Sequence, residues 1–152
     1  MLWLGIKILT RKNLKKMPRI KKIDYTYAVG RRKSSSARVR LFKGKGENTV
    51  NGMPAEKYFP GGISKKALVK PFGATETSEK YYYSAKVSGG GKEGQLGALI
   101  LGLSRVLVKI APDKNRVTLR KLNLLTRDSR IRQRRMVGMG GKSRRKKQSP
   151  KR

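Results

Sequence analysis

The densest group of residues that could do chemistry is a run of cations and hydroxyls, residues 30–36 (GRRKSSS). Arg38 and Arg40 follow within a few positions. The planar guanidinium of arginine can bind two phosphate oxygens at once, so this composition suits a phosphate backbone. A solvated loop is the alternative explanation, but five cations in ten residues favour a phosphate-binding patch. Its members are Arg31, Arg32, Lys33, Arg38 and Arg40.

A second group of cations occupies the C-terminal part of the chain, residues 127–152. Arg130, Arg132 and Arg134 alternate there, so an extended segment would present them on one side. Residues 140–152 offer no apolar anchor, and such a tail is either solvated or threaded through a polyanion. We expect phosphate contacts at the start of this tail from Arg127, Arg130, Arg132, Arg134 and Arg135.

Several kinds of chemistry are excluded by composition. The chain has no cysteine and no histidine, and none of its 8 carboxylates is paired in a convincing acid–base site. These absences exclude disulfides, Cys/His zinc sites, and catalysis by a thiol or an imidazole. We therefore predict no catalytic residue, no metal site and no cofactor. No run approaches the roughly 18 apolar residues of a transmembrane helix, and no membrane partner is predicted.

A glycine pattern, G-x-G-x-x-G, is formed by Gly89, Gly91 and Gly94 between a predicted strand and a predicted helix. In dinucleotide-binding enzymes this pattern is followed by an acidic residue that ends a second parallel strand, and Asp113 lies near that spacing. The helical period, however, runs straight to Pro112, and too little chain follows for a doubly wound sheet. The favoured interpretation is a tight strand-to-helix turn whose bare amides can hold a phosphate.

Three consecutive tyrosines, Tyr81, Tyr82 and Tyr83, form another candidate group. Exposed tyrosines can stack on nucleic-acid bases. Because side chains alternate between the faces of a strand, at least one of the three should face the core. Ordinary core and surface positions are therefore the favoured explanation, and base stacking is the alternative.

The net charge shows what kind of partner these groups need. The chain has 40 Lys and Arg against 8 Asp and Glu, a formal net charge of +32. Such a charge repels itself in a compact state, so a nucleic acid, an anionic membrane surface or an acidic protein must neutralise it. Residues 1–22 carry +8 (8 basic, no acidic), residues 23–126 carry +13 (20 basic, 7 acidic) and residues 127–152 carry +11 (12 basic, 1 acidic). The two ends are densest in charge, and such blocks fold or dock on their partner.

The middle segment, residues 23–126, must position the first group of cations, and its patterns predict a single α+β domain. In residues 37–41 apolar and basic residues alternate, so one strand face should enter the core and the other present Arg38 and Arg40. The expected strands are residues 25–33, 37–42, 49–52 and 81–88. The expected helices are 54–58 with Pro54 in the first turn, 65–70 with Ser64 as cap and Pro71 as stop, 93–111 ended by Pro112, and 113–122 with Asp113 as cap.

The most regular of these helices, residues 93–111, has a single apolar stripe. Gly97 and Gly102 weaken it by roughly 1 kcal/mol each relative to Ala, and we expect them to let the helix lie close against the sheet. In the helix that follows, Leu119 and Leu122 are expected to face inward. The stripe consists of Leu96, Leu99, Ile100, Leu103, Leu107 and Ile110.

The N-terminal segment, residues 1–22, has a short apolar stretch followed by basic residues. A signal peptide has the opposite order and a small-residue cleavage site, so this segment does not resemble one. The favoured expectation is a basic arm that is disordered by itself. One alternative is an amphipathic arm that touches a membrane, and another is a start at Met17 that makes residues 1–16 an upstream extension.

Short motifs follow one another along most of the chain. They are residues 30–33 (GRRK), 37–39 (ARV), 44–46 (GKG), 50–52 (VNG), 58–60 (YFP), 87–95 (VSGGGKEGQ), 102–105 (GLSR) and 124–130 (LLTRDSR), with Lys151-Arg152 at the end. Through these motifs the chain resembles the ninth protein of the small ribosomal subunit, in its bacterial or organellar form. The motifs occur in the same order as in that family, from about Tyr25 to Arg152.

The resemblance implies an α+β domain related to the second domain of ribosomal protein five of the same subunit, with a long basic extended C-terminal tail. It implies a place in the subunit head, bound to small-subunit rRNA beside neighbouring head proteins, in the ribosome of a bacterial cytoplasm or of an organelle. It further implies that the tail reaches the decoding region, where Lys151 and Arg152 approach peptidyl-site tRNA.

The chain departs from the family pattern at several positions. Ala28-Val29 stands where the family commonly has Gly-Thr, and Ile100-Leu101 where a polar or basic pair is common. The tail ends in residues 148–152 (QSPKR), whereas the family commonly has an aromatic residue before the last Ser-Lys-Arg. The terminal charges are kept, so the expectation of phosphate contacts carries over.

Three other functions are compatible with parts of the sequence. A DNA-compacting protein or general nucleic-acid chaperone would share the charge and the tails but have no defined partner, and sedimentation with ribosomal subunits separates the two. A dinucleotide-binding enzyme would follow from the glycine pattern, and a nucleotide titration tests it. A membrane-surface protein would bind anionic vesicles through residues 1–16.

Overall fold

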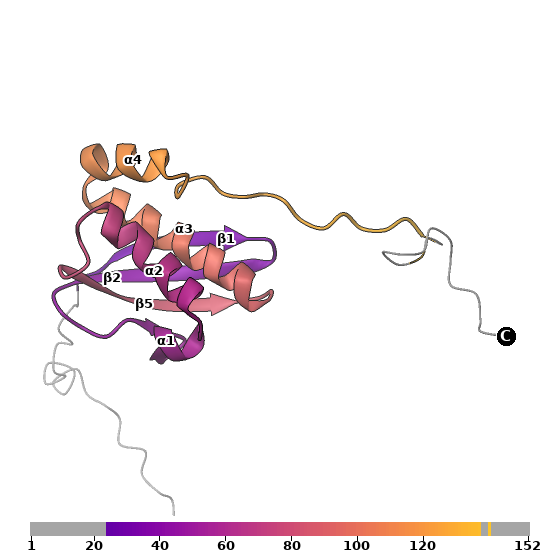
Figure 1. Cartoon of the computed structure of the whole chain (residues 1–152), viewed down its shortest axis with the longest axis horizontal. Helices are drawn as coiled ribbons and strands as arrows, with labels where there is room; N and C mark the ends of the chain where they lie inside the picture. The colour runs from indigo at the N-terminus through magenta and orange to yellow at the C-terminus, as the bar shows by residue number, and fades with distance from the viewer. Residues whose placement is uncertain (1–23, 138–139, 141–152) are drawn as a thin grey trace, which may run out of the picture.

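The computed structural model describes residues 24–137 and 140. They form a β-sheet with a layer of helices packed on one of its faces (Figure 1). The strands are β1 (Thr26–Arg32), β2 (Ser35–Lys43), β3 (Thr49–Val50), β4 (Met53–Pro54) and β5 (Tyr81–Ser88). The helices are α1 (Ala55–Tyr58), α2 (Gly62–Ala74), α3 (Lys92–Ile110) and α4 (Pro112–Lys121). The predicted α+β class is confirmed.

The strands lie in the order β1-β2-β5-β3-β4. Neighbours pair antiparallel except β3 and β5, which are parallel. Parallel neighbours need a crossover connection, and α2 lies in the chain between β3 and β5. β1 and β2 are joined by a two-residue turn in which Lys33 has a φ of 50°.

Strand β2, which lies between β1 and β5, has one buried and one exposed face. Ala37, Val39 and Leu41 are at most 2% exposed, while Arg38 and Arg40 between them are exposed. Successive side chains of a strand point to opposite faces, so the apolar set of β2 joins the core and the basic set stays in solvent. The predicted division of this strand into an apolar and a basic face is confirmed.

Helix α3 is the centre of the helical layer. Leu99, Leu103 and Leu107 of the predicted stripe are fully buried against the sheet side of the core. Leu101 and Val106, outside the stripe, are also buried at 5% and 0% exposure. A single stripe was therefore an incomplete prediction, because α2 and α4 also pack against α3 and cover more of its circumference.

Helix α3 and strand β1 are packed so closely that a Cβ atom at their contact would not fit. A Cβ atom on Gly30 would lie 1.9 Å from the Ala98 carbonyl oxygen and 2.5 Å from the Gly102 nitrogen. A Cβ atom on Gly102 would lie 2.7 Å from the side chain of Val39. The prediction that Gly102 lets α3 lie against the sheet is confirmed, and Gly97 instead makes room for the Arg32 side chain, with 3.3 Å between its would-be Cβ and the Arg32 Cγ.

Helix α2 differs from its prediction at both ends. It begins after Gly61 rather than at a Ser64 cap, and it continues through Pro71 to Ala74. An interior proline removes a hydrogen bond and costs about 3 kcal/mol in an isolated helix. Here Pro71 and Phe72 are buried, and the Phe72 ring stacks on Tyr83 with 6.0 Å between ring centroids, so tertiary packing offsets the loss.

The ends of two other helices also differ from expectation. α3 ends before Pro112 as predicted, but α4 begins with Ala111 at its N-cap and no side-chain cap, so Asp113 is a first-turn residue and not the cap. Leu119 is buried as predicted, whereas Leu122 is 41% exposed because α4 has ended before it. Pro54 precedes α1 instead of lying in its first turn, since it pairs with Thr49 in β4.

The free edge of the sheet at β1 is closed by cations from α3. Arg105 Nη1 donates to the carbonyl oxygen of Val29 at 2.8 Å, and Lys109 Nζ donates to that of Tyr27, also at 2.8 Å. These bonds occupy carbonyl groups that would otherwise be open to another strand. In the part of the chain that the structure describes, no helix is long and apolar enough to cross a membrane.

Candidate nucleic-acid interface

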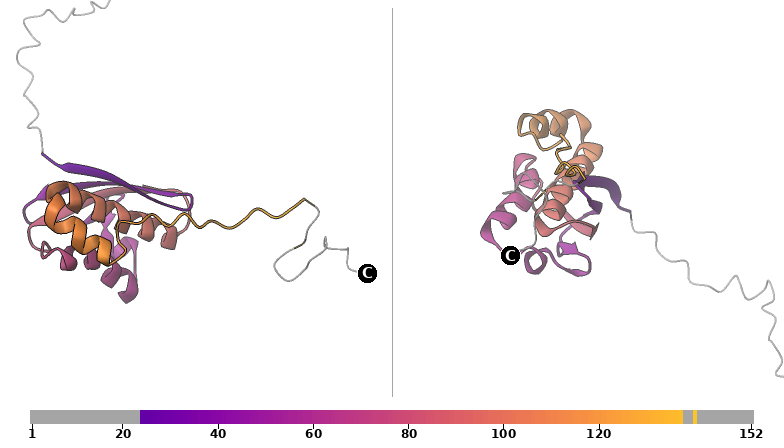
Figure 2. Two further views of the ribbon diagram at one scale, coloured as in Figure 1. Left: turned by 90° about the horizontal axis from the view of Figure 1, so that it is seen from above. Right: turned by 90° about the vertical axis from the view of Figure 1, so that its right-hand side faces the viewer.

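The candidate site is the face of the sheet that the described helices leave bare. In Figure 2 these helices gather on one side of β1, β2 and β5, and the other side of the three strands stays open. None of the three strands contains an acidic residue. An exposed face without carboxylates keeps its positive charge for a partner outside the chain.

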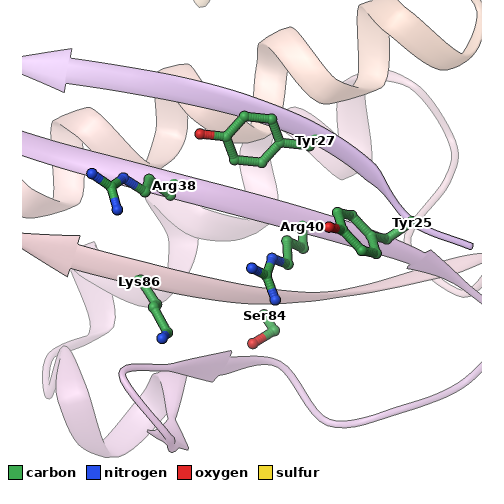
Figure 3. A pocket seen from close by; sticks show the side chains of 6 residues that line it. All are labelled: Tyr25, Tyr27, Arg38, Arg40, Ser84 and Lys86. Carbon is green, nitrogen blue, oxygen red and sulfur yellow. The ribbon is translucent and has the colours of Figure 1, made fainter. Parts of the chain in front are cut away.

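The strand register sets the side chains of the open face in rows. Arg38 is paired with Val29 on one side and with Lys86 on the other, and Arg40 is paired with Tyr27 and with Ser84. A shallow hollow of about 410 Å³ lies between these rows (Figure 3). It is lined by Tyr25, Tyr27, Arg38, Arg40, Ser84 and Lys86.

Aromatic rings border the cations on this face. The Arg40 guanidinium lies over the Tyr25 ring, 5.1 Å from its centroid. The Phe42 ring lies 5.8 Å from Tyr25 and is stacked on Tyr82 at 5.1 Å, so these rings form a row across the sheet. A guanidinium held over a ring by a cation–π contact is oriented and still keeps donors for phosphate oxygens.

The three consecutive tyrosines take different positions. Tyr83 is 2% exposed, which confirms that at least one of the three faces the core, and burial raises its pKa to about 12. Tyr81 is partly buried against the core, and Tyr82 lies on the open face against Phe42.

The first group of predicted phosphate ligands is divided by the fold. Arg31 is paired with Ser36 and lies on the open face with Arg38 and Arg40, whereas Lys33 lies in the β1–β2 turn. Arg32 points to the opposite side, toward α3, where its Nη1 is buried and forms an ion pair with Asp128. Arg31, Arg32 and Lys33 are consecutive in the sequence, but they therefore lie in three different parts of the structure.

Asp128 holds the start of the C-terminal segment against the domain. Besides Arg32, its carboxylate accepts from Arg130 Nη2 at 2.7 Å and from the Arg130 backbone N–H at 2.9 Å. Leu124 and Leu125 pack on the core just before it. We call Arg32, Asp128 and Arg130 the tail clip. Beyond it the chain leaves the domain (Figure 1).

The other predicted tail residues lie outside these contacts. The side chains of Arg127, Arg132, Arg134 and Arg135 are exposed. Lys151 and Arg152, the predicted tRNA ligands, lie outside the described residues.

The glycine pattern forms the predicted tight turn from β5 into α3. Gly89 and Gly90 have φ values of 75° and 61°, and Ser35 Oγ donates to the Gly89 carbonyl oxygen at 3.0 Å. A Cβ atom on Gly90 or on Gly94 would lie 2.2 Å or 2.8 Å from Ser35 Oγ, so these glycines permit close packing of the turn on the hairpin. After α3, residues 111–137 contain α4 and no strand, which is not the arrangement of a dinucleotide-binding sheet.

Four residues that line the hollow were absent from the predicted site residues: Tyr25, Tyr27, Ser84 and Lys86. Their strands were predicted, and alternation alone places Lys86 on the same face as Ser84. What the sequence did not indicate is that β5 pairs with β2. This pairing brings Lys86 beside Arg38, which lies 48 positions earlier in the chain.

Comparison with known proteins agrees with the resemblance seen in the sequence. Residues 30–152 match the family described as Ribosomal protein S9/S16. The chain is similar to the small ribosomal subunit protein uS9 of Cutibacterium acnes, with 39% identity over 112 residues. The match covers 74% of this chain, and it spans 65% of the length of that curated relative. This chain belongs to the ribosomal protein S9/S16 family.

Proposed function

We propose that the protein is a structural constituent of the small ribosomal subunit that binds small-subunit rRNA. Family membership supports this assignment, and the observation that carries it is the open sheet face with Arg31, Arg38, Arg40 and Lys86 and no carboxylate in its three main strands. No chemical step is needed for this role. The folded domain presents fixed cations to a fixed array of phosphates.

Recognition on this face is mainly electrostatic. Folded RNA is read largely through its backbone and its shape, so arginine and lysine without sequence readout suffice. Each phosphate that the protein neutralises should contribute a slope of about −0.7 to −0.9 to the dependence of log K on log salt. Titrating the full chain with a fragment of small-subunit rRNA between about 50 and 200 mM salt tests this mechanism. An affinity that stays flat over that range would refute it.

The tail extends the same chemistry away from the domain. The tail clip fixes where the tail starts, and Arg127, Arg132, Arg134 and Arg135 continue the cationic surface. By family resemblance we propose that the tail ends at peptidyl-site tRNA, with Lys151 and Arg152 as its ligands. A terminal cation close to phosphate can contribute about 1–2 kcal/mol through charge-assisted hydrogen bonds.

Deleting Lys151 and Arg152 tests the tRNA contact separately from the rRNA contact. Subunits that carry the truncated chain should assemble normally, because the sheet face and the tail clip are intact. Peptidyl-site tRNA should dissociate from them about 5- to 30-fold faster, the equivalent of the 1–2 kcal/mol above. An unchanged dissociation rate would refute the tRNA role and leave the rRNA role standing.

The finer placement of the protein also rests on the family. We infer a domain related to the second domain of small-subunit ribosomal protein five, located in the subunit head beside other head proteins. The ribosome would be that of a bacterial cytoplasm or an organelle. Sedimentation tests the assignment against a general nucleic-acid chaperone: the full chain should co-migrate with small subunits after a high-salt wash, whereas a chaperone would be distributed over all RNA fractions.

A further inference from the structure

Tyr27 is a feature of the open face that phosphate binding leaves unused. Its side chain is 41% exposed and is paired across the sheet with Arg40. Its position is fixed, because Lys109 Nζ donates to its backbone carbonyl oxygen at 2.8 Å and the strand is paired with β2. An aromatic ring is thus partly exposed on the edge strand β1, beside the cations that β2 presents on the open face.

The surroundings of Tyr27 differ from those of the neighbouring aromatic residues. The Tyr25 ring already has Arg40 over it and Phe42 beside it, and Tyr82 stacks on Phe42. Within residues 24–137 and 140, no other aromatic ring and no cation is stacked on Tyr27. Figure 3 shows its ring beside Arg38 and Arg40 of β2, with Lys86 on β5 beyond them; all four residues line the hollow.

A duplex and a single strand would use this ring differently. In an RNA duplex the faces of the bases are covered by stacking, and a protein reaches only backbone and groove edges. In an unpaired segment a base can leave the stack and lie on an aromatic side chain while its flanking phosphates meet cations.

We propose that the open face binds an unpaired RNA segment, with one base stacked on Tyr27 and the adjacent phosphates on Arg38, Arg40 and Lys86. This inference rests on the proposed rRNA-binding function and names the form of RNA that the face takes. The positive charge of the open face favours a polyanion, and the exposed Tyr27 ring favours RNA whose bases are unpaired. The Ser84 hydroxyl in the same hollow can donate to or accept from the sugar or the base.

Substitution of Tyr27 in the full-length chain tests the proposal. The probes are a fluorescent eight-nucleotide uridine strand and a blunt-ended RNA duplex of two fully complementary strands, each at low and at high salt. Tyr27→Ala should weaken binding of the single strand about 5- to 150-fold, the range expected for one stacked base, by the same factor at both salt concentrations. Binding of the duplex should be unchanged. Tyr27→Phe should behave like the wild type.

Two controls separate stacking from folding. Tyr27→Leu keeps apolar bulk without an aromatic face and should lose the same affinity as Tyr27→Ala. Val29→Ala, two residues along on the same face, should have no effect. Equal losses for the single strand and the duplex, or full affinity in Tyr27→Leu, would overturn the proposal.

Cross-linking identifies the peptide that contacts the RNA, so it distinguishes RNA bound at the open face from RNA bound by the basic ends of the chain. A strand containing 4-thiouridine should cross-link to the peptide that contains Tyr27. Cross-links confined to other peptides would overturn the proposal. A different result is expected if the open face does not bind RNA at all. The double substitution Arg38→Gln with Arg40→Gln would then leave RNA affinity and its salt dependence unchanged, regardless of the effect of substituting Tyr27.

Discussion

For a single cationic residue, the face of the sheet to which its side chain points decides what the side chain can contact. Arg31 and Arg32 are adjacent in sequence, yet one lies on the open face and the other pairs with Asp128 beside α3. The first is available to phosphate, whereas the second already has a counter-charge. We therefore expect Arg32 to act by positioning the tail and Arg31 to act by binding RNA.

Tyr83 gives a prediction for the pH dependence of stability. Its pKa is raised from the ordinary value of 10.0 to about 12 because burial disfavours the phenolate. Above pH 10 the unfolded chain therefore releases a proton that the folded chain retains, and the free energy of unfolding should fall as pH rises from about 10 to 12. The fall assigned to Tyr83 should total about 2–3 kcal/mol.

The matched variant is Tyr83→Phe, which keeps the ring that stacks on Phe72 and removes the titrating group. Urea unfolding at neutral pH should give nearly the same stability for both proteins. Between pH 10 and 12 the wild type should lose stability faster than the variant, because the two chains differ only in the phenol hydroxyl of residue 83. Parallel curves would show that burial of Tyr83 does not control this loss.

Residue patterns in the sequence were informative where they are local. The alternation of Ala37, Arg38, Val39, Arg40 and Leu41 was enough to predict which side chains face solvent, because strand geometry alone decides it. The ion pair between Arg32 and Asp128 was not predictable in this way. It depends on the path of the chain after α4, which brings residues 96 positions apart into contact.

At the scale of elements, the contact between β1 and α3 determines the geometry of the open face. Helix α3 fixes β1 through the Arg105 and Lys109 bonds to its backbone and through the glycine contact at Gly30 and Gly102. The position of Tyr27 beside Arg40 is a consequence. Elements were predicted well when their pattern was continuous, as in α3, and less well when packing outweighed propensity, as at Pro71 in α2.

Gly30→Ala tests that contact. The new methyl group would meet the Ala98 carbonyl oxygen and the Gly102 nitrogen, both backbone atoms that cannot turn away. We expect a loss of about 3 kcal/mol or more in the free energy of unfolding, at the upper end of overpacking costs. Gly73→Ala in α2 is the control, because its methyl group meets nothing within 4 Å, and it should be neutral or stabilising by up to about 1 kcal/mol. Similar effects of the two substitutions on urea unfolding would contradict the close packing.

The tail clip gives a second prediction at this scale. Asp128→Asn removes the charge that Arg32 and Arg130 share, and it should cost about 1 kcal/mol, since the groups are only partly buried. Hydrogen exchange of the backbone amide of Arg130, which donates to Asp128, should become faster. Exchange in β2 should not change. A double-mutant cycle of Asp128→Asn with Arg32→Met that gives no coupling energy would exclude the clip.

In the whole molecule, the positive charge is shared between the folded domain and the basic segments at the two ends of the chain. The net charge of +32 indicates only that a polyanion is the partner. The fold adds that one face of the body is free of acidic residues in its main strands and that the tail starts from a fixed point. The sequence predicted the exposed basic face for β2 alone. The strands on either side of β2 are set by long-range pairing, which the sequence pattern does not indicate.

We propose that the open sheet face is the surface through which the protein binds rRNA in the small subunit. The most direct test is competition between wild-type and variant chains for incorporation into small subunits. The variant Arg38→Gln with Arg40→Gln loses two charges from the open face, and the control Lys66→Gln with Lys70→Gln loses two exposed charges from α2. After sedimentation and a high-salt wash, we predict that the open-face variant is depleted about tenfold or more relative to wild type, while the α2 variant is incorporated nearly equally. Equal incorporation of both variants would contradict the account.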